Sequence, residues 1–192
     1  RGPARLGSHQ HEGALGDYFG CSIDMSGERA MIGAYGDDVN GQVNSGSAYI
    51  FYRDAGGTWR YPTPKLWGDN VTTDYFGTSV SISGDRAIVG APGDGDTGGY
   101  GEGAAYVFEI VDGVWTEKAK IVANDRVEGQ DDRFGTSVGI SGNWAIVGAH
   151  LDDNVAEDAG AAYLFELVGD TWTYRQKLVT NRNAAWASTG YF

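Results

Sequence analysis

Several residue types are scarce in this sequence, and each scarcity narrows what the chain can be. The chain has one cysteine, Cys21, so no disulfide can form within it. It has only four prolines, and no apolar run approaches the roughly 18 to 20 residues that a membrane-spanning helix needs. No window shows the sustained i, i+3, i+4 apolar spacing of an amphipathic helix. The sequence therefore offers no signal for a helical or membrane-spanning fold.

Basic residues are scarce as well. The chain has 14 Lys and Arg residues against 26 Asp and Glu residues, which gives a formal net charge of −12. A protein that binds a nucleic-acid backbone or an anionic membrane needs a basic patch. The charge argues against both of these partners and favours cations, basic surfaces or neutral glycans.

Glycine and repetition are what the sequence has in abundance. The 31 glycines, with frequent Val, Ile, Tyr, Phe and Trp, favour short strands joined by tight turns. One passage occurs three times, as DYFGCSIDMSGERAMIGAYGDD, DYFGTSVSISGDRAIVGAPGDG and DRFGTSVGISGNWAIVGAHLDD. Its Phe recurs as Phe19, Phe76 and Phe134, and Phe192 falls one further period on, inside a cut-off fourth copy. A fixed period of this length indicates a repeat architecture.

Each copy reads as four antiparallel strands. In the second copy, the alternation of residues 79–83 predicts a half-buried strand, and the turn Gly84-Asp85 leads to a second strand over residues 86–91 that is apolar on both faces. A polar loop precedes a third strand from Gly103, and a fourth begins at Trp115. Four such strands in about 57 residues form one blade of a β-propeller. The predicted fold is all-β, with three blades and a ring that is incomplete within this chain.

The motif that carries the repeats resembles a known family. Phe76-Gly77 is followed about a dozen residues later by Gly90-Ala91-Pro92, which is similar to the FG-GAP repeat of integrin α-type β-propellers. The other copies keep both steps, with Tyr35 and His150 in place of the proline. The residues expected to maintain the repeat are Phe19, Gly20, Phe76, Gly77, Phe134, Gly135, Gly33, Gly90 and Gly148. The resemblance implies an extracellular or cell-surface binding and adhesion module.

One departure from that family is chemically important. Integrin-type repeats carry a D-x-D-x-D-G calcium loop between the first two strands of a blade, whereas this chain has only Gly-Glu, Gly-Asp or Gly-Asn there. Such a turn offers too few oxygens for the six to eight ligands that calcium takes. The repeats resemble the branch of the family without the calcium loop.

Most of the acidic residues are expected on one face. In a four-stranded blade, the loop between the second and third strands emerges on the same face as the link to the next blade. One interpretation of this acidic face is a solvated rim that blocks edge-to-edge aggregation. The other is a face that binds calcium or a basic partner. Its candidate metal ligands are Asp94, Asp96, Asp152 and Asp153, and its other candidate ligand-face acids are Asp37, Asp38, Glu157 and Asp158.

Other recurring residues are expected to be structural. Asp17, Asp74 and Asp132 precede the Phe-Gly step at one offset and are predicted to cap turn amides. Trp59, Trp115 and Trp172 are expected to pack between blades rather than to form a sugar-stacking ladder. Cys21 is predicted to be a small buried filler.

No catalytic constellation stands out in the sequence. None of the three histidines, His9, His11 and His150, accompanies a nucleophile motif, and no pair of acids is singled out for glycoside hydrolysis. We therefore expect a protein that is not an enzyme. Asn70-Val71-Thr72 is the single N-x-S/T triplet and makes Asn70 a candidate glycosylation site.

The repeats divide the chain into an N-terminal linker or blade-closing segment (1–16), repeats over 17–73, 74–131 and 132–189, and the start of a fourth repeat (190–192). Three blades do not close a ring, because propellers have about four to eight. We expect a piece of a longer chain, half of a six-bladed ring made by two copies, or a repeating subunit of an extended assembly.

These observations support three functional hypotheses. The leading one is a non-enzymatic extracellular module that binds a protein or glycan ligand on its acidic loop face. The second is a structural subunit of an extracellular filament or matrix. The third is the propeller domain of a secreted hydrolase. Fold alone does not decide among them.

Overall fold

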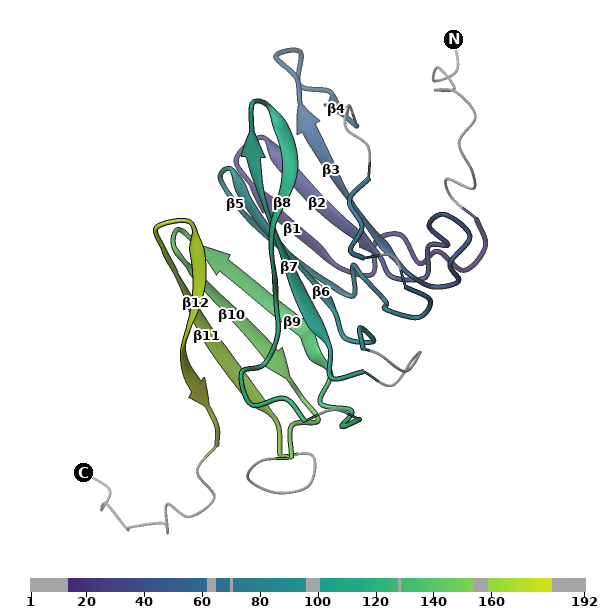
Figure 1. Cartoon of the computed structure of the whole chain (residues 1–192). Helices are drawn as coiled ribbons and strands as arrows, with labels where there is room; N and C mark the ends of the chain where they lie inside the picture. The colour runs from purple at the N-terminus through teal and green to yellow at the C-terminus, as the bar shows by residue number, and fades with distance from the viewer. Residues whose placement is uncertain are drawn as a thin grey trace, which may run out of the picture.

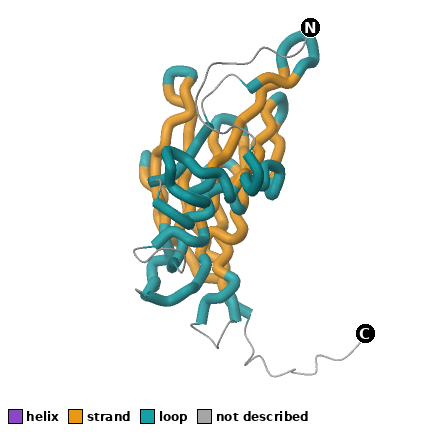
Figure 2. The backbone as a smooth tube through the Cα atoms, turned by 90° about the vertical axis from the view of Figure 1, so that its right-hand side faces the viewer, coloured by secondary structure: helices purple, strands orange, loops and turns teal. Residues whose placement is uncertain are grey.

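The computed structural model describes residues 14–61, 65–69, 71–95, 101–127, 129–153 and 159–180 of the chain. These residues form strands and loops only, as Figure 2 shows. No helix of membrane-spanning length and apolarity is found among them. The predicted site residues Asn70, Asp96, Glu157 and Asp158 lie outside the described residues.

Twelve strands in the described residues form three four-stranded antiparallel sheets, each of which we call a blade (Figure 1). Blade 1 contains β1 (Ile23–Ser26), β2 (Arg29–Ala34), β3 (Ser47–Arg53) and β4 (Trp59–Arg60). Blade 2 contains β5 (Ser79–Ser83), β6 (Arg86–Ala91), β7 (Ala104–Val111) and β8 (Val114–Ile121). Blade 3 contains β9 (Phe134–Ser141), β10 (Trp144–Ala149), β11 (Ala161–Val168) and β12 (Thr171–Leu178).

The strand order of each blade is sequential, so the predicted all-β blade architecture is confirmed. None of the three sheets closes into a barrel. The register pairs Ser83 with Arg86, which leaves Gly84 and Asp85 as the two-residue turn that the sequence predicts. Blade 1 is the least regular, because its fourth strand is only two residues long and pairing resumes at a single bridge between Leu66 and Ala48.

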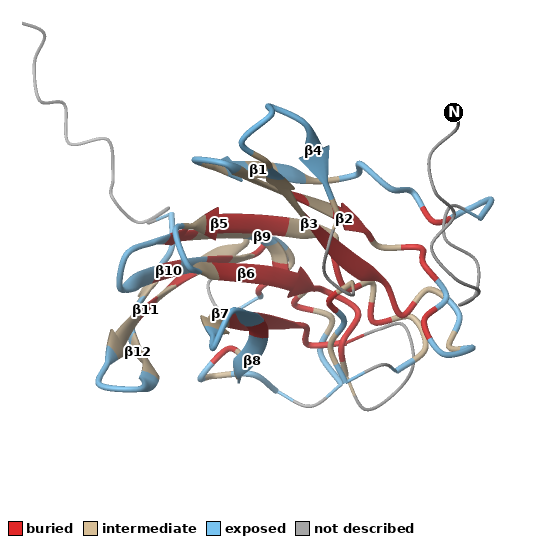
Figure 3. Cartoon of the chain, turned by 90° about the horizontal axis from the view of Figure 1, so that it is seen from above, coloured by how far each residue is buried: buried red, intermediate tan, exposed pale blue. Residues whose placement is uncertain are grey.

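Two apolar cores hold the three blades side by side. The first lies between blades 1 and 2, where Met31 and Ile50 meet Phe76 and Val89. The second lies between blades 2 and 3 and includes Ile88 and Val107 of blade 2 with Phe134 and Val147 of blade 3. Blade 2 is thus covered on both faces, which explains why most of β6 is buried, as Figure 3 shows in red.

Neighbouring blades also interlock through glycines. A Cβ on Gly33 would collide with the carbonyl oxygen of Gly77 in blade 2, and a Cβ on Gly90 would collide with that of Gly135 in blade 3. Those carbonyls also accept hydrogen bonds across the junction, from Ser22 Oγ at 2.8 Å and from Ser79 Oγ at 2.7 Å. The Gly-Ala step of one blade therefore packs directly against the Phe-Gly step of the next, because only a residue without a side chain permits so close an approach.

The first blade shows what the junction does, because no described blade covers its leading face. Phe19 is 53% exposed, whereas the equivalent Phe76 and Phe134 are 1% and 0% exposed. Cys21 is exposed too, so the prediction of a buried filler is wrong for this residue. The equivalent residues of the other blades, Thr78 and Thr136, are half-buried.

The tryptophans of the outer strands behave differently from one another. Trp115 is buried in the first core, and its indole N–H donates a hydrogen bond to the Tyr52 hydroxyl of blade 1, which confirms the predicted packing between blades. Trp172 packs against the second core, while Trp59 on β4 is partly exposed.

Substituting the junction glycine tests the interlock. We expect Gly90→Ala to lower the free energy of unfolding by about 1–3 kcal/mol, because the new methyl group meets a backbone carbonyl that cannot rotate away. Gly148→Ala is the matched control, since the nearest atom there is the rotatable Ser137 hydroxyl of the same blade. Urea denaturation of both variants measures the difference. Equal losses of stability would contradict the interlock.

Candidate functional site

The links between blades are fixed by aspartate caps. The Asp17 carboxylate accepts a hydrogen bond from Ala14 N at 2.6 Å, and that of Asp74 accepts one from Val71 N at 2.9 Å. The backbone carbonyl of Asp74 also accepts a hydrogen bond from Gly93 N at 3.0 Å, in the loop after β6. The predicted capping role is confirmed for these two residues, and the caps tie each link to the loop beside it.

A buried carboxylate network lies at the loop end of blade 2. Asp94, in the loop after β6, accepts hydrogen bonds from the Tyr106 hydroxyl of β7 at 2.5 Å and from Lys120 Nζ of β8 at 2.8 Å. Lys120 Nζ also donates to Asp69 of the preceding link, at 2.6 Å. One ammonium group on β8 therefore holds the loop after β6 and the preceding link together.

The same network recurs in blade 3. Asp152 accepts hydrogen bonds from Tyr163 at 2.5 Å and from Lys177 at 2.7 Å. Lys177 reaches Asp125 of the link at 2.9 Å, and its ammonium group lies 5.0 Å from the centroid of the Tyr163 ring. This second instance shows that the network belongs to the repeat.

In blade 1 the equivalent carboxylate is Asp37. It accepts hydrogen bonds from Ser47 at 2.5 Å, Tyr49 at 2.9 Å and Lys65 at 2.7 Å. Sequence reasoning noticed the aspartates but missed the lysine and tyrosine. Their signal is the recurrence of Lys at the end of each fourth strand and of Ala-Tyr or Ser-Ala-Tyr in each third strand.

Sequence reasoning also missed a groove that crosses the blade junctions at the start of the loops. We call it the junction groove. It measures about 550 Å³, and its lining includes Tyr35, Tyr75, Pro92, Arg133, Thr136 and His150. These residues come from three recurring positions: the residue before each Phe-Gly step, the residue after each Phe-Gly step and the residue after each Gly-Ala step. Their fixed offsets are the signal that could have revealed it.

The repeat spacing, the interlocked glycines and the recurring loop network are all properties of one repeating unit. The FG-GAP repeat family model matches residues 10–51, 67–108 and 115–165. This chain belongs to the FG-GAP repeat family. The resemblance predicted from Phe-Gly and Gly-Ala-Pro is thereby confirmed. No curated protein matches the chain.

The charges of the FG-GAP network in blade 2 are unequal. Burial raises the pKa of Asp94, although hydrogen bonds from Lys120 and Tyr106 oppose it. Asp69 also experiences desolvation, but the hydrogen bonds from Lys120 and Tyr106 outweigh it and lower its pKa. The two directions differ because Asp94 is the more deeply buried partner of the same lysine. Burial disfavours the charged form of Lys120, but hydrogen bonds to Asp69 and Asp94 outweigh it and raise the pKa of the lysine.

Two of the aspartates that precede the Phe-Gly steps, Asp74 and Asp132, have pKa values that are raised toward neutral pH. Burial, with the Asp94 and Asp69 carboxylates nearby, raises the pKa of Asp74 to about 7. Burial and Asp152 raise the pKa of Asp132 to about 6. These carboxyls are therefore partly protonated in the native protein, where the same groups in an unfolded chain would be ionised.

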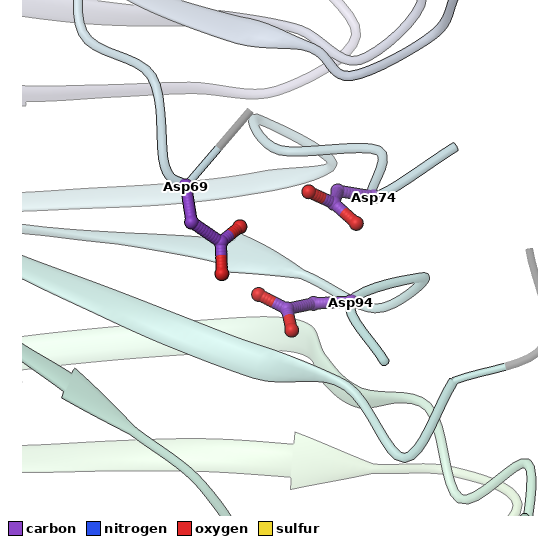
Figure 4. A group of neighbouring side chains, drawn as sticks. All are labelled: Asp69, Asp74 and Asp94. Carbon is purple, nitrogen blue, oxygen red and sulfur yellow. The ribbon is translucent and has the colours of Figure 1, made fainter. Parts of the chain in front are cut away.

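The predicted metal ligands do not form one cluster, and Asp94 lies instead with two other aspartates. Figure 4 shows Asp69, Asp74 and Asp94 turned toward one space, and each offers an oxygen within 4.8 Å of those of the other two. Lys120 already donates to two of these carboxylates. Asp152 belongs to the network of blade 3, and Asp153 is exposed beside it. Calcium binding by Asp94, Asp96, Asp152 and Asp153 stays a prediction.

The candidate ligand-face acids differ in accessibility. Asp37 is buried and would have to give up its three hydrogen bonds to contact a partner. Asp38 is exposed, and one of its oxygens accepts a hydrogen bond from Asn44 N at 2.8 Å. Part of the acidic composition therefore stabilises the loops from within.

Removing the cation of one network should expose its structural role. Lys177→Met removes an ammonium group that pairs with Asp152, whose side chain is 0% exposed. We expect a loss of about 3 kcal/mol in the free energy of unfolding. The control is Lys118→Met, because Lys118 is exposed on β8. If both variants unfold at the same urea concentration, the network does not stabilise the loops.

The raised pKa of Asp74 predicts a pH dependence. The folded state holds a proton on Asp74 up to about pH 7, while the unfolded carboxyl loses it near pH 4. The stability contribution is thus full below about pH 4 and is lost as the pH rises through 7. We expect Asp74→Asn to flatten the decline in unfolding free energy between pH 5 and 8. A decline as steep as that of the wild type would contradict this assignment.

Proposed function

We propose that this FG-GAP chain is a non-enzymatic extracellular binding module that uses its loop face to engage a partner. FG-GAP repeats are found in adhesion-type β-propeller proteins and typically occur in extracellular proteins. The junction groove is the single observation that carries the proposal. It is an open, shallow depression of about 550 Å³, a volume within the range of ligand pockets in proteins.

The lining of the groove supports binding without turnover. It offers two tyrosines, a proline, two threonines, a histidine and an arginine, and no Asp or Glu of the described residues lines it. Glycoside hydrolysis needs a pair of carboxyl groups beside the substrate. The nearby carboxylates are instead engaged by lysine and tyrosine within the blades.

The proposal is tested on an array of purified matrix proteins and glycans. We expect saturable binding to at least one class, and at least a tenfold loss of affinity in Tyr75→Ala. Trp59→Ala is the control, because it removes a partly exposed aromatic residue from the outer strand β4. Absence of saturable binding, equal binding by both variants, or conversion of the bound ligand into a product would contradict the proposal.

A second candidate function is a structural subunit that assembles blade against blade. The leading face of blade 1 exposes Phe19, Ile23 and Met25, at 53%, 73% and 60%. Their repeat equivalents Phe76, Val80 and Ile82 are buried against the preceding blade. A further blade, from whichever chain, would bury this apolar surface in the same way.

Light scattering over a range of concentrations tests this second function. Self-assembly predicts a mass that grows with concentration and a monomeric Ile23→Asp variant, because a charge on the leading face cannot be buried unpaired. Val43→Asp, in an exposed loop, should assemble as the wild type does. A mass that stays that of one chain at every concentration would rule this function out.

A further inference from the structure

The junction groove spans three blades. Tyr35 follows β2 of blade 1, Tyr75 and Pro92 belong to blade 2, and Arg133 and His150 flank β9 and β10 of blade 3. The first strands of the three blades, β1, β5 and β9, lie next to one another. The groove is therefore built on rigid strand ends, and its shape depends on both interlocked junctions.

Its aromatic side chains are fixed in place. Tyr35 stacks on Tyr18 with ring centroids 4.8 Å apart and planes 10° from parallel, and it meets Tyr75 edge-on at 6.1 Å. Tyr75 itself has a positive φ of 55°. Its carbonyl oxygen accepts hydrogen bonds from the amide of Thr78 at 3.1 Å and from its hydroxyl at 2.7 Å. A locked tyrosine loses little entropy when a ligand stacks on it.

Left-handed backbone at these positions is unfavourable for large side chains. Arg133 has a φ of 57°, and Tyr18 has one of 53°. A residue other than glycine in this region costs on the order of 1 kcal/mol, and such residues cluster at ligand sites. Two of these strained residues, Tyr75 and Arg133, line the groove, and the third, Tyr18, stacks on the lining residue Tyr35.

The polar groups of the groove favour a ligand rich in hydroxyls. The Thr136 hydroxyl donates its proton to the carbonyl of Arg133 at 2.8 Å and lies 3.0 Å from His150 Nδ1. His150 lines the groove, and an imidazole ring can exchange a hydrogen bond with a ligand hydroxyl.

The charge of the groove favours a neutral ligand. Arg133 forms an ion pair with Asp131, with Nε 2.5 Å from the carboxylate. No Asp or Glu of the described residues lines the groove to attract a basic partner, and the net charge of −12 repels acidic polymers. Aromatic rings stack on the apolar C–H faces of sugar rings, and hydroxyl and imidazole groups bind their hydroxyls.

We propose that the junction groove binds a neutral oligosaccharide, with Tyr35 and Tyr75 stacking on its sugar rings and His150 hydrogen-bonding to one of its hydroxyls. This assignment rests on the proposed binding function and names its ligand class.

Isothermal titration of the 192-residue protein with neutral trisaccharides tests the assignment. The probes are maltotriose, cellotriose, mannotriose and chitotriose, with trigalacturonate as the charged comparison. We expect saturable binding of at least one neutral trisaccharide, at least fivefold weaker binding of trigalacturonate, and affinity that is unchanged between 50 and 500 mM NaCl. Tyr75→Ala should weaken binding at least tenfold, and the Trp59→Ala control should bind as the wild type does.

His150→Ala provides a second variant that does not depend on the strained backbone, because His150 is exposed in the loop after β10. We expect at least a threefold loss of affinity from it, with unchanged thermal unfolding. The assignment is overturned if no neutral trisaccharide binds at millimolar concentration, if the charged one binds best, or if neither variant weakens binding. Loss of a protein ligand in Tyr75→Ala without any sugar binding would overturn the sugar assignment alone and leave the binding function intact.

Discussion

The contact between glycines of neighbouring blades is the constraint on which the rest of the structure depends. Gly33 and Gly90 lie so close to the carbonyls of Gly77 and Gly135 that no side chain fits between them. This approach brings Phe76 and Phe134 into the apolar cores and sets the first strands side by side. The two halves of the FG-GAP motif are thus the two sides of one interface, contributed by consecutive blades.

The loop face follows from that interface. Each junction brings the residue before a Phe-Gly step close to the residue after a Gly-Ala step, and the junction groove lies between them. Beside it, Lys120 and Lys177 bind a link carboxylate and a loop carboxylate together. The acids therefore fix the loops, and the groove that we propose as the binding site is lined by other residues.

Much of the fold could be predicted because the repeat is clear in the sequence. The repeat period predicted the number and position of the blades. The alternation of residues 79–83 and the turn at Gly84-Asp85 predicted strands that the structure contains. Cys21 was misjudged because the prediction followed the usual burial of free cysteine, and residue type alone does not show how a position is covered in the fold.

The site was less predictable, because it depends on burial and on contacts between blades. A sequence shows that Asp37, Asp94 and Asp152 recur, but not that each is buried beneath a lysine and a tyrosine of its own blade. The groove was missed for a related reason. Tyr75 and His150 come from different blades, and only the junctions bring them into one lining.

Amide hydrogen exchange measured by NMR at low protein concentration tests the central claim most directly. Ile82 N and Ile140 N donate across the junctions to Asp24 at 2.8 Å and to Ser81 at 3.3 Å. The equivalent Met25 N donates to the adjacent side chain of Asp24 at 2.7 Å, and no described blade lies on that side of it. If blades are held by their junctions, Ile82 and Ile140 should exchange at least tenfold more slowly than Met25. Equal exchange at all three amides would contradict the account.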